Sequence, residues 1–369
     1  MKQILIVKDA LAPWSKGGGE DRYFLLSSLF SEQKMRIKFA SMKWWDGENP
    51  KNHIALAKLV PLYCKNGTRS KFQAIYFALS TFKILWLKPD LIEADQAPIL
   101  QVIPLWIVSR LLRIPFSCTV HEYWGREYWV NNYGIIGHVG SRIENLVLKL
   151  PDVVIVPSTL TAARISKATK ELVSPIIIPN EILLPPKEKI STKLREADIL
   201  YVGRLIEHKR VDLVISTFEV LLKKFPTLHL GIVGIGPDFE ILNQQAERTL
   251  PTKSYTFFGS LEKKMDVLGL MLKCKIFISP SEREGFGISV LEALELGRPS
   301  LISSSKDNAS TEFIDQYSNL YIVDEQSPIA YAEIAKGILE NSTAVIAGKP
   351  ILREKNLATR YVEVWEGLL

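Results

Sequence analysis

The chain has 369 residues, of which 47% are hydrophobic and 23% charged, and its formal net charge is +6. This length and composition predict roughly two globular domains and exclude a disordered or fibrous chain. The three cysteines, Cys64, Cys118 and Cys274, lie far apart, so they indicate neither a disulfide framework nor a zinc site. The chain runs directly into a strand with no signal peptide, and a cytoplasmic location is therefore expected.

Positive charge is concentrated in the first half of the chain. Residues 1–180 carry 23 Lys and Arg against 14 Asp and Glu, a net charge of +9, whereas residues 181–369 carry 23 against 26, a net charge of −3. A basic first half favours contact with an anionic acceptor or with an anionic membrane at its inner face, and a surface that serves only solubility is the alternative. Nucleic acid is not an expected partner, because no motif that reads RNA or DNA is present.

No segment has the roughly 18–20 uninterrupted apolar residues that a membrane-spanning helix needs. The nearest candidates are residues 72–87 and 97–112, and both are interrupted by polar residues. Both are therefore predicted to be buried or interfacial helices.

Strands and helices alternate along the whole chain. In the first half, strands are predicted at residues 4–7, 37–40, 91–94, 116–120, 153–156 and 176–178, with helices between them, for example at 20–31 and 143–150. In the second half, strands are predicted at 199–202, 228–233, 256–258, 276–278 and 300–302. This alternation predicts parallel α/β architecture, and the Pro- and Lys-rich residues 183–192 are the expected linker between two domains.

The segment that follows the predicted strand at 275–279 is the most informative part of the sequence. A short turn and the start of a helix carry Glu284, Gly285, Phe286, Gly287, Ile288 and Glu292. A glycine turn before a helix N-terminus is a natural anion site, because free backbone N–H groups and the helix dipole point there. Glu284 and Glu292 would repel an anion unless each binds an uncharged group such as a sugar hydroxyl. The alternative is a surface helix with solvated acids.

This segment resembles the donor-site signature of retaining glycosyltransferases of the GT-B fold, the family 4 group also called glycosyl transferases group 1. The shared pattern is Glu, seven residues, Glu, with Gly-Phe-Gly after the first Glu. The resemblance implies two Rossmann-like, doubly wound parallel-sheet domains that face each other across a cleft. It also implies a nucleoside-diphosphate sugar as donor, a glycan or lipid-linked acceptor, and catalysis with no metal or other cofactor.

Further matches to this family precede the glutamates in the second half. Gly203 and Arg204 follow a predicted strand and Lys209 lies five residues later, which implies contact with the donor diphosphate. Gly234 and Gly236 resemble the family's Gly-x-Gly-Pro turn. Two residues, Ser260 and Leu261, resemble the stretch whose backbone lies against the nucleobase.

The resemblance also implies a division of roles. Glu292 would accept hydrogen bonds from the ribose and Glu284 from the transferred sugar. Arg204 and Lys209, together with backbone amides from Phe286 to Ile288, would stabilise the leaving diphosphate.

The first half is expected to hold the acceptor. Gly17, Gly18 and Gly19 follow the first strand and open a helix, which resembles the family's glycine loop, and a flexible turn is the alternative. His121 follows the strand at 116–120 at the place where the family often has histidine, which implies contacts with sugar or acceptor. The aromatic residues between 123 and 133 suit sugar stacking or a lipid interface, or equally packing within the loop.

We therefore expect an acceptor domain at residues 1–182, completed by a terminal helix at about 355–369, and a donor domain at residues 193–350. The predicted activity is metal-independent hexosyl transfer. A sugar-nucleotide epimerase of the same fold and a non-catalytic glycan-binding subunit are the alternatives.

Overall fold

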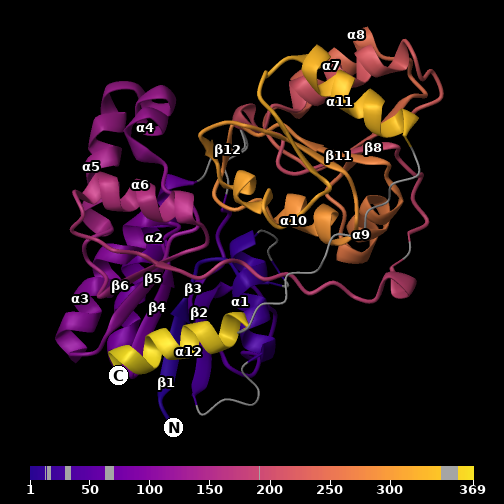
Figure 1. The fold of residues 1–369 in the computed structure, drawn as a ribbon. Helices are drawn as coiled ribbons and strands as arrows, with labels where there is room; N and C mark the ends of the chain where they lie inside the picture. The colour runs from indigo at the N-terminus through magenta and orange to yellow at the C-terminus, as the bar shows by residue number, and fades with distance from the viewer. Residues whose placement is uncertain (13, 15–17, 30–34, 63–69, 191, 342–355) are drawn as a thin grey trace. The chain divides into compact units, whose positions relative to one another are not determined.

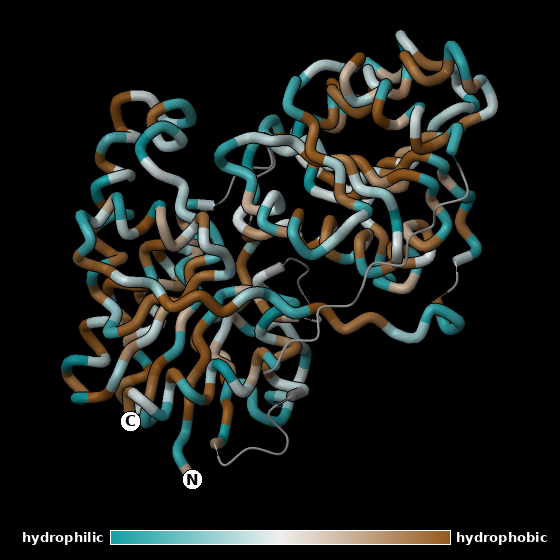
Figure 2. Tube along the Cα trace, in the orientation of Figure 1, coloured by the Kyte–Doolittle hydropathy of each residue, from teal (hydrophilic) through white to brown (hydrophobic). Residues whose placement is uncertain are grey.

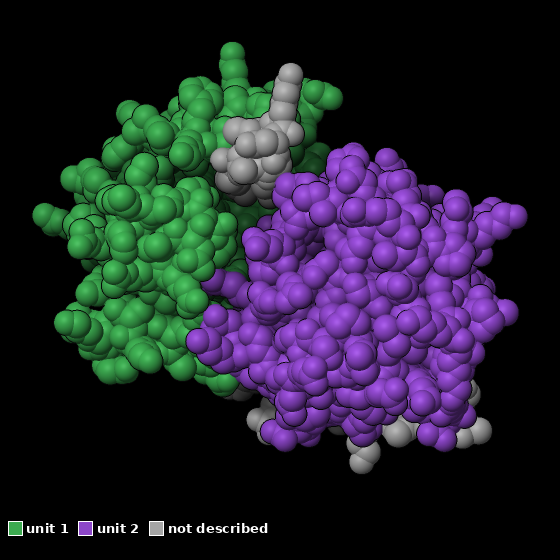
Figure 3. All heavy atoms as spheres, turned by 90° about the horizontal axis from the view of Figure 1, so that it is seen from above, with its two compact units in different colours: residues 1–181, 353–369 green, residues 182–352 purple. Residues whose placement is uncertain are grey.

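The chain forms two compact α/β units. Unit 1 comprises Met1–Glu181 and Arg353–Leu369, and unit 2 comprises Ile182–Leu352 (Figures 1 and 3). The computed structural model describes all residues except 13, 15–17, 30–34, 63–69, 191 and 342–355.

Unit 1 is built on a seven-stranded parallel sheet of order β3-β2-β1-β4-β5-β6-β7. Its strands are β1 (Gln3–Val7), β2 (Arg36–Lys43), β3 (His53–Lys58), β4 (Leu91–Asp95), β5 (Phe116–Thr119), β6 (Val153–Val156) and β7 (Ile176–Ile177). Its helices include α1 (Gly18–Leu29), α2 (Lys71–Ser80), the 3₁₀ helix η2 (Thr81–Trp86), α3 (Val102–Leu112), α4 (Gly125–Tyr133), α5 (Gly137–Val147), α6 (Thr159–Thr169) and α12 (Leu357–Leu368).

Unit 2 has a six-stranded parallel sheet of order β10-β9-β8-β11-β13-β15 and a small sheet of β12 and β14. Its strands are β8 (Ile199–Val202), β9 (Leu230–Val233), β10 (Tyr255–Gly259), β11 (Ile276–Ser279), β12 (Arg283–Glu284), β13 (Ser300–Ser303), β14 (Asp307–Asn308) and β15 (Leu320–Val323). Its helices include α7 (Val211–Leu222), α8 (Phe239–Thr249), α9 (Lys264–Lys273), α10 (Ile288–Glu295) and α11 (Pro328–Glu340).

Both sheets are doubly wound, as predicted. In each unit the first strand lies inside the sheet, the next two extend to one side and the later strands to the other. The winding reverses between β1 and β4 in unit 1 and between β8 and β11 in unit 2. In open α/β sheets, ligands bind outside the carboxyl ends of the strands at this switch point.

Each sheet is buried on both faces, which explains why its strands read as apolar runs. Figure 2 shows hydrophobic residues along the strands within each unit. In β1, Leu5 and Val7 belong to one core and Ile4 and Ile6 to another, since successive side chains point to opposite faces of a strand. Four buried clusters, two per unit, therefore hold the helices on the sheets.

The terminal helix α12 packs on unit 1, where Tyr361 and Trp365 are fully buried beside residues of α1 and β1. Glu181 accepts a hydrogen bond from the backbone N–H of Leu357 at 2.7 Å, at the start of α12. A carboxylate at a helix N-terminus satisfies an otherwise free donor and complements the helix dipole, so Glu181 serves the anchoring of α12.

Some elements differ from the prediction. The helix predicted at residues 143–150 is α5, which begins at Gly137. A Cβ atom at Gly137 would lie 2.1 Å from the backbone oxygen of Trp129, and one at Gly140 would lie 2.4 Å from its ring. The two glycines therefore permit close packing of α5 against α4. The strands β3 and β15 were not predicted.

None of the helices in the described part of the chain combines the length and the apolar character needed to span a bilayer. The predicted segment 72–87 forms α2 and η2, and the segment 97–112 contains α3.

Candidate functional site

The residues predicted to bind the donor lie at the carboxyl edge of the unit 2 sheet, after four neighbouring strands. Gly203 and Arg204 follow β8, Gly234 and Gly236 follow β9, Ser260 and Leu261 follow β10, and Glu284 to Ile288 follow β11. Since β8 and β11 flank the switch point, this edge is the candidate ligand site of unit 2.

The loops after β8 and β9 are in direct contact. The backbone N–H of Gly203 donates to Val233 O at 3.0 Å, and that of Leu205 donates to Ile235 O at 3.0 Å. Gly234 has φ +146°, and a Cβ atom there would lie 1.8 Å from Gly203 O. Only glycine fits this position, so the Gly-x-Gly turn has a packing role as well as its predicted ligand role.

The loop after β8 brings Lys209 against Glu284. The backbone N–H of Glu282 donates to His208 O at 2.9 Å, which ties the β8 loop to the segment after β11. Lys209 Nζ and Glu284 Oε1 are 2.5 Å apart, and only 12% and 14% of their side chains are exposed. Ser281 Oγ also donates to Glu284 Oε1, at 3.1 Å. Two residues predicted to contact different parts of a donor thus pair with each other.

Glu292 also has a cationic partner, which the sequence analysis missed. Lys264 Nζ, from the first turn of α9, lies 2.6 Å from Glu292 Oε1. The carboxylate is 5% exposed, whereas the side chain of Lys264 is 52% exposed. The Lys264 side chain therefore has room to move into solvent, whereas Glu292 is held inside the unit.

The turn before α10 has the geometry of an anion site. Gly287 is the N-cap residue with φ +85°, and a Cβ atom there would lie 2.0 Å from Ser310 Oγ. The ring of Phe286 is buried and its centroid lies 5.2 Å from that of Phe313. Because the ring anchors the turn in the core, the first N–H groups of α10, starting at Ile288, are held in a fixed place.

Cationic groups outnumber acids around His208 at this edge. Burial, together with the charges of Lys209 and Arg204, lowers the pKa of His208 to about 4. His208 is therefore neutral at neutral pH, and cationic groups surround it. Arg204 itself is exposed. A polyanion such as a diphosphate is the kind of ligand that this field favours.

Unit 1 holds a second cluster at its own switch point. Lys8 follows β1, Asp95 ends β4, and His121 lies just beyond β5. Lys8 Nζ is hydrogen-bonded to Asp95 Oδ2, and His121 Nε2 lies 3.1 Å from the same oxygen. Lys8 Nζ also lies 3.7 Å from Glu20 Oε1 in α1.

Burial and ionic contacts act in opposite directions on this cluster. Burial favours neutral Asp95, but the charges of Lys8 and His121 outweigh it and hold its pKa well below its usual range. Burial also favours the neutral form of Lys8 and so lowers its pKa. The charges of Asp95 and Glu20 outweigh this effect and raise the pKa of Lys8 above its ordinary value. The cluster is therefore a charged pair with a histidine at its side.

The glycine loop of unit 1 is described only in part. Gly17 lies outside the described residues, and Gly18 is the first residue of α1. Gly19 lies against the charged cluster, because a Cβ atom there would be 3.0 Å from both His121 Nε2 and Lys8 Nζ. The structure thus brings Gly19 and His121 together. Lys8 and Asp95 were missed, although both directly follow apolar runs that were predicted as strands.

The aromatic residues after His121 pack mainly with one another. Trp124 and Trp129 have ring centroids 5.5 Å apart, and Trp129 and Tyr133 lie 5.4 Å apart. Trp129 Nε1 donates to Glu144 Oε2 of α5 at 2.9 Å. Of the alternatives open at the sequence level, these contacts favour packing.

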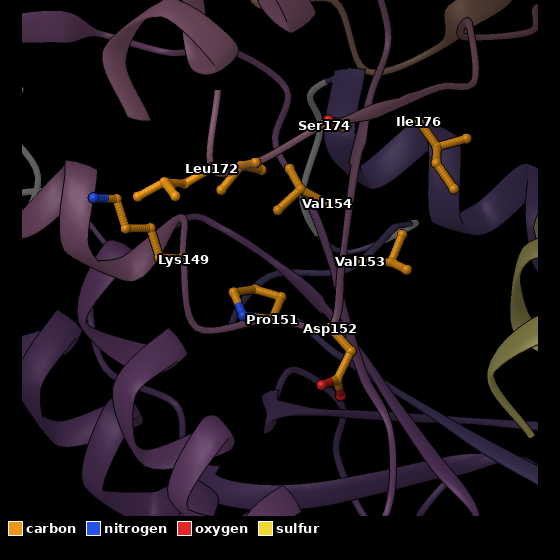
Figure 4. A pocket seen from close by; sticks show the side chains of 9 residues that line it. Lys149, Pro151, Asp152, Val153, Val154, Leu172, Ser174 and Ile176 are labelled. Atoms are coloured by element: carbon orange, nitrogen blue, oxygen red, sulfur yellow. The ribbon is translucent and has the colours of Figure 1, made fainter. Parts of the chain in front are cut away.

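A cavity in unit 1 lies away from this cluster. It is lined by residues that include Lys149, Pro151, Asp152 and Leu172 (Figure 4). Pro151 and Asp152 precede β6, so the cavity is at the amino end of that strand, opposite the edge that carries His121. Within the described residues, no group of three or more His, Cys, Asp or Glu is placed to hold a metal ion.

Two doubly wound parallel α/β units, each with polar residues at its switch point, define the GT-B class of glycosyltransferase folds. Residues 186–353, almost all of them in unit 2, match the family model of glycosyl transferases group 1.

Relatives and solved structures agree with this class. An uncharacterized glycosyltransferase of Haemophilus influenzae is 28% identical over 200 residues, which cover 53% of this chain and 54% of the relative. A GDP-mannose-dependent alpha-(1-6)-phosphatidylinositol dimannoside mannosyltransferase of Mycobacterium tuberculosis is 26% identical over 45% of this chain and 40% of its own length. The chain thus spans about half the length of the curated relatives it matches.

Among solved structures, Anabaena Alr3699/HepE in complex with UDP-glucose superposes with a TM-score of 0.74 at 17% identity, and the match covers 100% of both chains. The sucrose-phosphate synthase of Thermosynechococcus elongatus gives a TM-score of 0.72 at 16% identity over 100% of this chain and 95% of the other. These likenesses establish the fold.

Proposed function

We propose that this chain is a retaining glycosyltransferase that moves a sugar from a nucleoside diphosphate to an acceptor bound by unit 1. The observation that carries the proposal is the gathering of Lys209, Glu284, Lys264 and Glu292 at the switch point of unit 2, beside the N-terminus of α10. Cations and helix N–H groups suit a diphosphate, and carboxylates suit sugar hydroxyls.

The donor and acceptor classes follow from the same residues. Glu292 would accept from the ribose and Glu284 from the transferred sugar, while Arg204, Lys209 and the N–H groups near Ile288 would hold the diphosphate. When the donor binds, Lys209 and Lys264 would each lose the ionic contact with its carboxylate partner and would contact a phosphate or solvent in its place. The name of the mycobacterial relative includes GDP-mannose and the Anabaena structure contains UDP-glucose, which supports a nucleoside-diphosphate sugar as donor. The acceptor would be a glycan or a lipid-linked glycan, and no metal or other cofactor is required.

In the proposed reaction, the bond between the sugar anomeric carbon and the diphosphate oxygen breaks while the acceptor oxygen bonds to the same face of the sugar. The acceptor proton passes to the leaving diphosphate. The positive groups around the diphosphate would stabilise the charge that develops on it. On this route the protein needs no general base, and His121 would position the sugar or the acceptor.

The decisive test is transfer from UDP-, GDP- and ADP-sugars to glycan and lipid-linked acceptors, with the anomeric configuration of the product determined by NMR. We expect retention, and an inverted linkage would contradict the proposal. A reaction with donor alone that yields free nucleotide or a rearranged sugar would identify an epimerase.

Replacing Glu284 tests its proposed role in the reaction, with a replacement of Glu282 as the matched control. Glu284→Gln should lower turnover by at least about 100-fold, because a charged hydrogen bond to the transferred sugar is lost. Glu282→Gln removes the same charge two residues earlier, where the side chain is 48% exposed and pairs with Arg210, and should retain activity. Equal turnover of Glu284→Gln and the unmodified protein would remove Glu284 from the active site.

A further inference from the structure

The outer face of α2 in unit 1 is apolar and exposed. Phe72, Ile75 and Leu79 are 70%, 51% and 63% exposed, and Trp86 at the end of η2 is 77% exposed. Spacings of three and four residues place the first three side chains on one side of the helix. They form a stripe, which is unlike the single exposed apolar residues found on most protein surfaces.

The opposite face of α2 already packs on the sheet. Ala74, Phe77 and Ala78 are buried, and Phe77 belongs to the core of unit 1. A helix on the surface of a globular protein needs only one apolar face, whereas α2 has two. The second face therefore requires an apolar environment outside the unit.

The charges of the chain segment that carries this face indicate what kind of apolar environment it contacts. From residue 49 to residue 89 the sequence has no Asp or Glu and seven cations: Lys51, Lys58, Lys65, Arg69, Lys71, Lys83 and Lys88. The lysines of this set that the structure describes, Lys51, Lys58, Lys71, Lys83 and Lys88, are all exposed. An apolar stripe in a chain segment that has cations and no acids complements acyl chains below anionic headgroups.

We propose that α2 and η2 form a docking surface for an anionic phospholipid bilayer. Phe72, Ile75, Leu79 and Trp86 enter the boundary between headgroups and acyl chains, and the lysines contact lipid phosphates. This surface lies in unit 1, and its lipid binding requires no donor. A failure of the docking proposal would therefore leave the proposed transfer reaction untouched.

The test is sedimentation of the full chain with vesicles, without donor. We expect binding to vesicles of about 60% phosphatidylcholine and 40% phosphatidylglycerol, weak binding to phosphatidylcholine alone, and a decrease as salt rises from about 0.1 to 0.5 M. The triple variant F72S/I75S/L79S should bind the anionic vesicles at least about ten-fold more weakly, because each lost apolar side chain reduces the buried area. Lys58→Gln with Lys71→Gln should weaken binding to anionic vesicles and leave the weak binding to neutral ones unchanged.

Matched controls make the assignment specific. Ile241 and Ile329 of unit 2 are 67% and 66% exposed, so I241S/I329S removes comparable apolar surface and should retain binding. Circular dichroism and thermal unfolding would show that each variant is folded. Absence of vesicle binding by the unmodified chain would overturn the proposal.

Two other results would also overturn it. One is loss of binding in I135S/I136S, whose residues are 87% and 76% exposed, with the triple variant unaffected, since the contact would then be in another element. The other is a dimer of the unmodified chain that the triple variant abolishes while vesicle binding persists, since a second copy would then occupy the stripe.

Discussion

At the residue scale, each unit has a lysine–carboxylate pair at the switch point of its sheet, buried in unit 1 and partly buried in unit 2. In unit 1 the pair is Lys8 and Asp95, and in unit 2 it is Lys209 and Glu284. Removing one member of a buried pair leaves an uncompensated charge, whereas replacing both by apolar groups is often nearly neutral. The two kinds of substitution therefore separate the electrostatic contribution of a pair from its packing.

Asp95→Asn should destabilise unit 1 by about 3–5 kcal/mol, because Lys8 would remain charged and buried with only the more distant Glu20 as an ionic partner. The double substitution K8M/D95L, which removes both charges, should recover most of this loss. Urea unfolding followed by tryptophan fluorescence measures both effects. Equal destabilisation by the single and the double variant would mean that packing at this position matters more than charge.

The same pair predicts an acid dependence. The folded-state pKa of Asp95 lies below its unfolded value of about 3.9, so the stabilisation it contributes is fully present above pH ~4 and is lost as pH falls through the folded pKa. Unit 1 should therefore lose stability as the pH drops below about 4. In K8M/D95L this loss should be shallower, and urea midpoints measured between pH about 2 and 7 would show the difference. An unchanged acid slope in the double variant would contradict the assignment.

At the element scale, the terminal helix α12 is part of the core of unit 1. Arg22 of α1 donates to Tyr361 Oη at 2.8 Å and to Asn180 Oδ1 at 2.6 Å, and its third hydrogen bond goes to Ile178 O at 2.8 Å. Trp365 Nε1 donates to Ser117 Oγ of β5 at 3.2 Å. These contacts connect α12 with α1, the end of the first segment of unit 1, and the middle of the sheet.

Trp365→Ala should therefore destabilise unit 1 by about 3–5 kcal/mol, because a fully buried indole leaves a large cavity. Glu366→Ala, on the exposed side of the same helix, should change stability by less than about 0.5 kcal/mol. Denaturant unfolding and limited proteolysis of α12 would measure the difference. If both variants unfolded at the same denaturant concentration, α12 would not contribute to the core.

Sequence analysis predicted elements well where local patterns coincide with tertiary packing. β8 and β11 are continuous apolar runs between turn residues, and the glycine turn before α10 has its own local signature. β3 was missed because its sequence, His-Ile-Ala-Leu-Ala-Lys, includes two alanines, which are poor strand formers, and pairing with the neighbouring β2 makes it a strand. Lys264 was missed for a related reason: it is an ordinary helix lysine until the fold brings α9 beside Glu292.

At the scale of the whole molecule, the chain consists of two units with separate cores. The buried clusters of unit 1 contain residues of β1 to β6 and α12, and those of unit 2 contain residues of β8, β9, β11, β13 and β15. Each unit buries its own apolar surface, so each should unfold as a cooperative domain. Trp365→Ala lowers the stability of unit 1 and would identify the transition that belongs to it.

A nucleoside-diphosphate sugar should then raise the midpoint of the unit 2 transition. At a ligand concentration of 100 times Kd, binding adds about 2.7 kcal/mol to the stability of the binding unit. For a domain of this size, that corresponds to an upward shift of about 5–10 °C in calorimetry, with the unit 1 transition much less affected.

Glu292→Gln should reduce the shift, because the buried carboxylate that would accept from the ribose becomes a neutral amide. Glu325→Gln, at an exposed position, should retain the full shift. A shift confined to the transition that Trp365→Ala lowers would instead assign the donor to unit 1 and contradict the site proposed at the carboxyl edge of the unit 2 sheet.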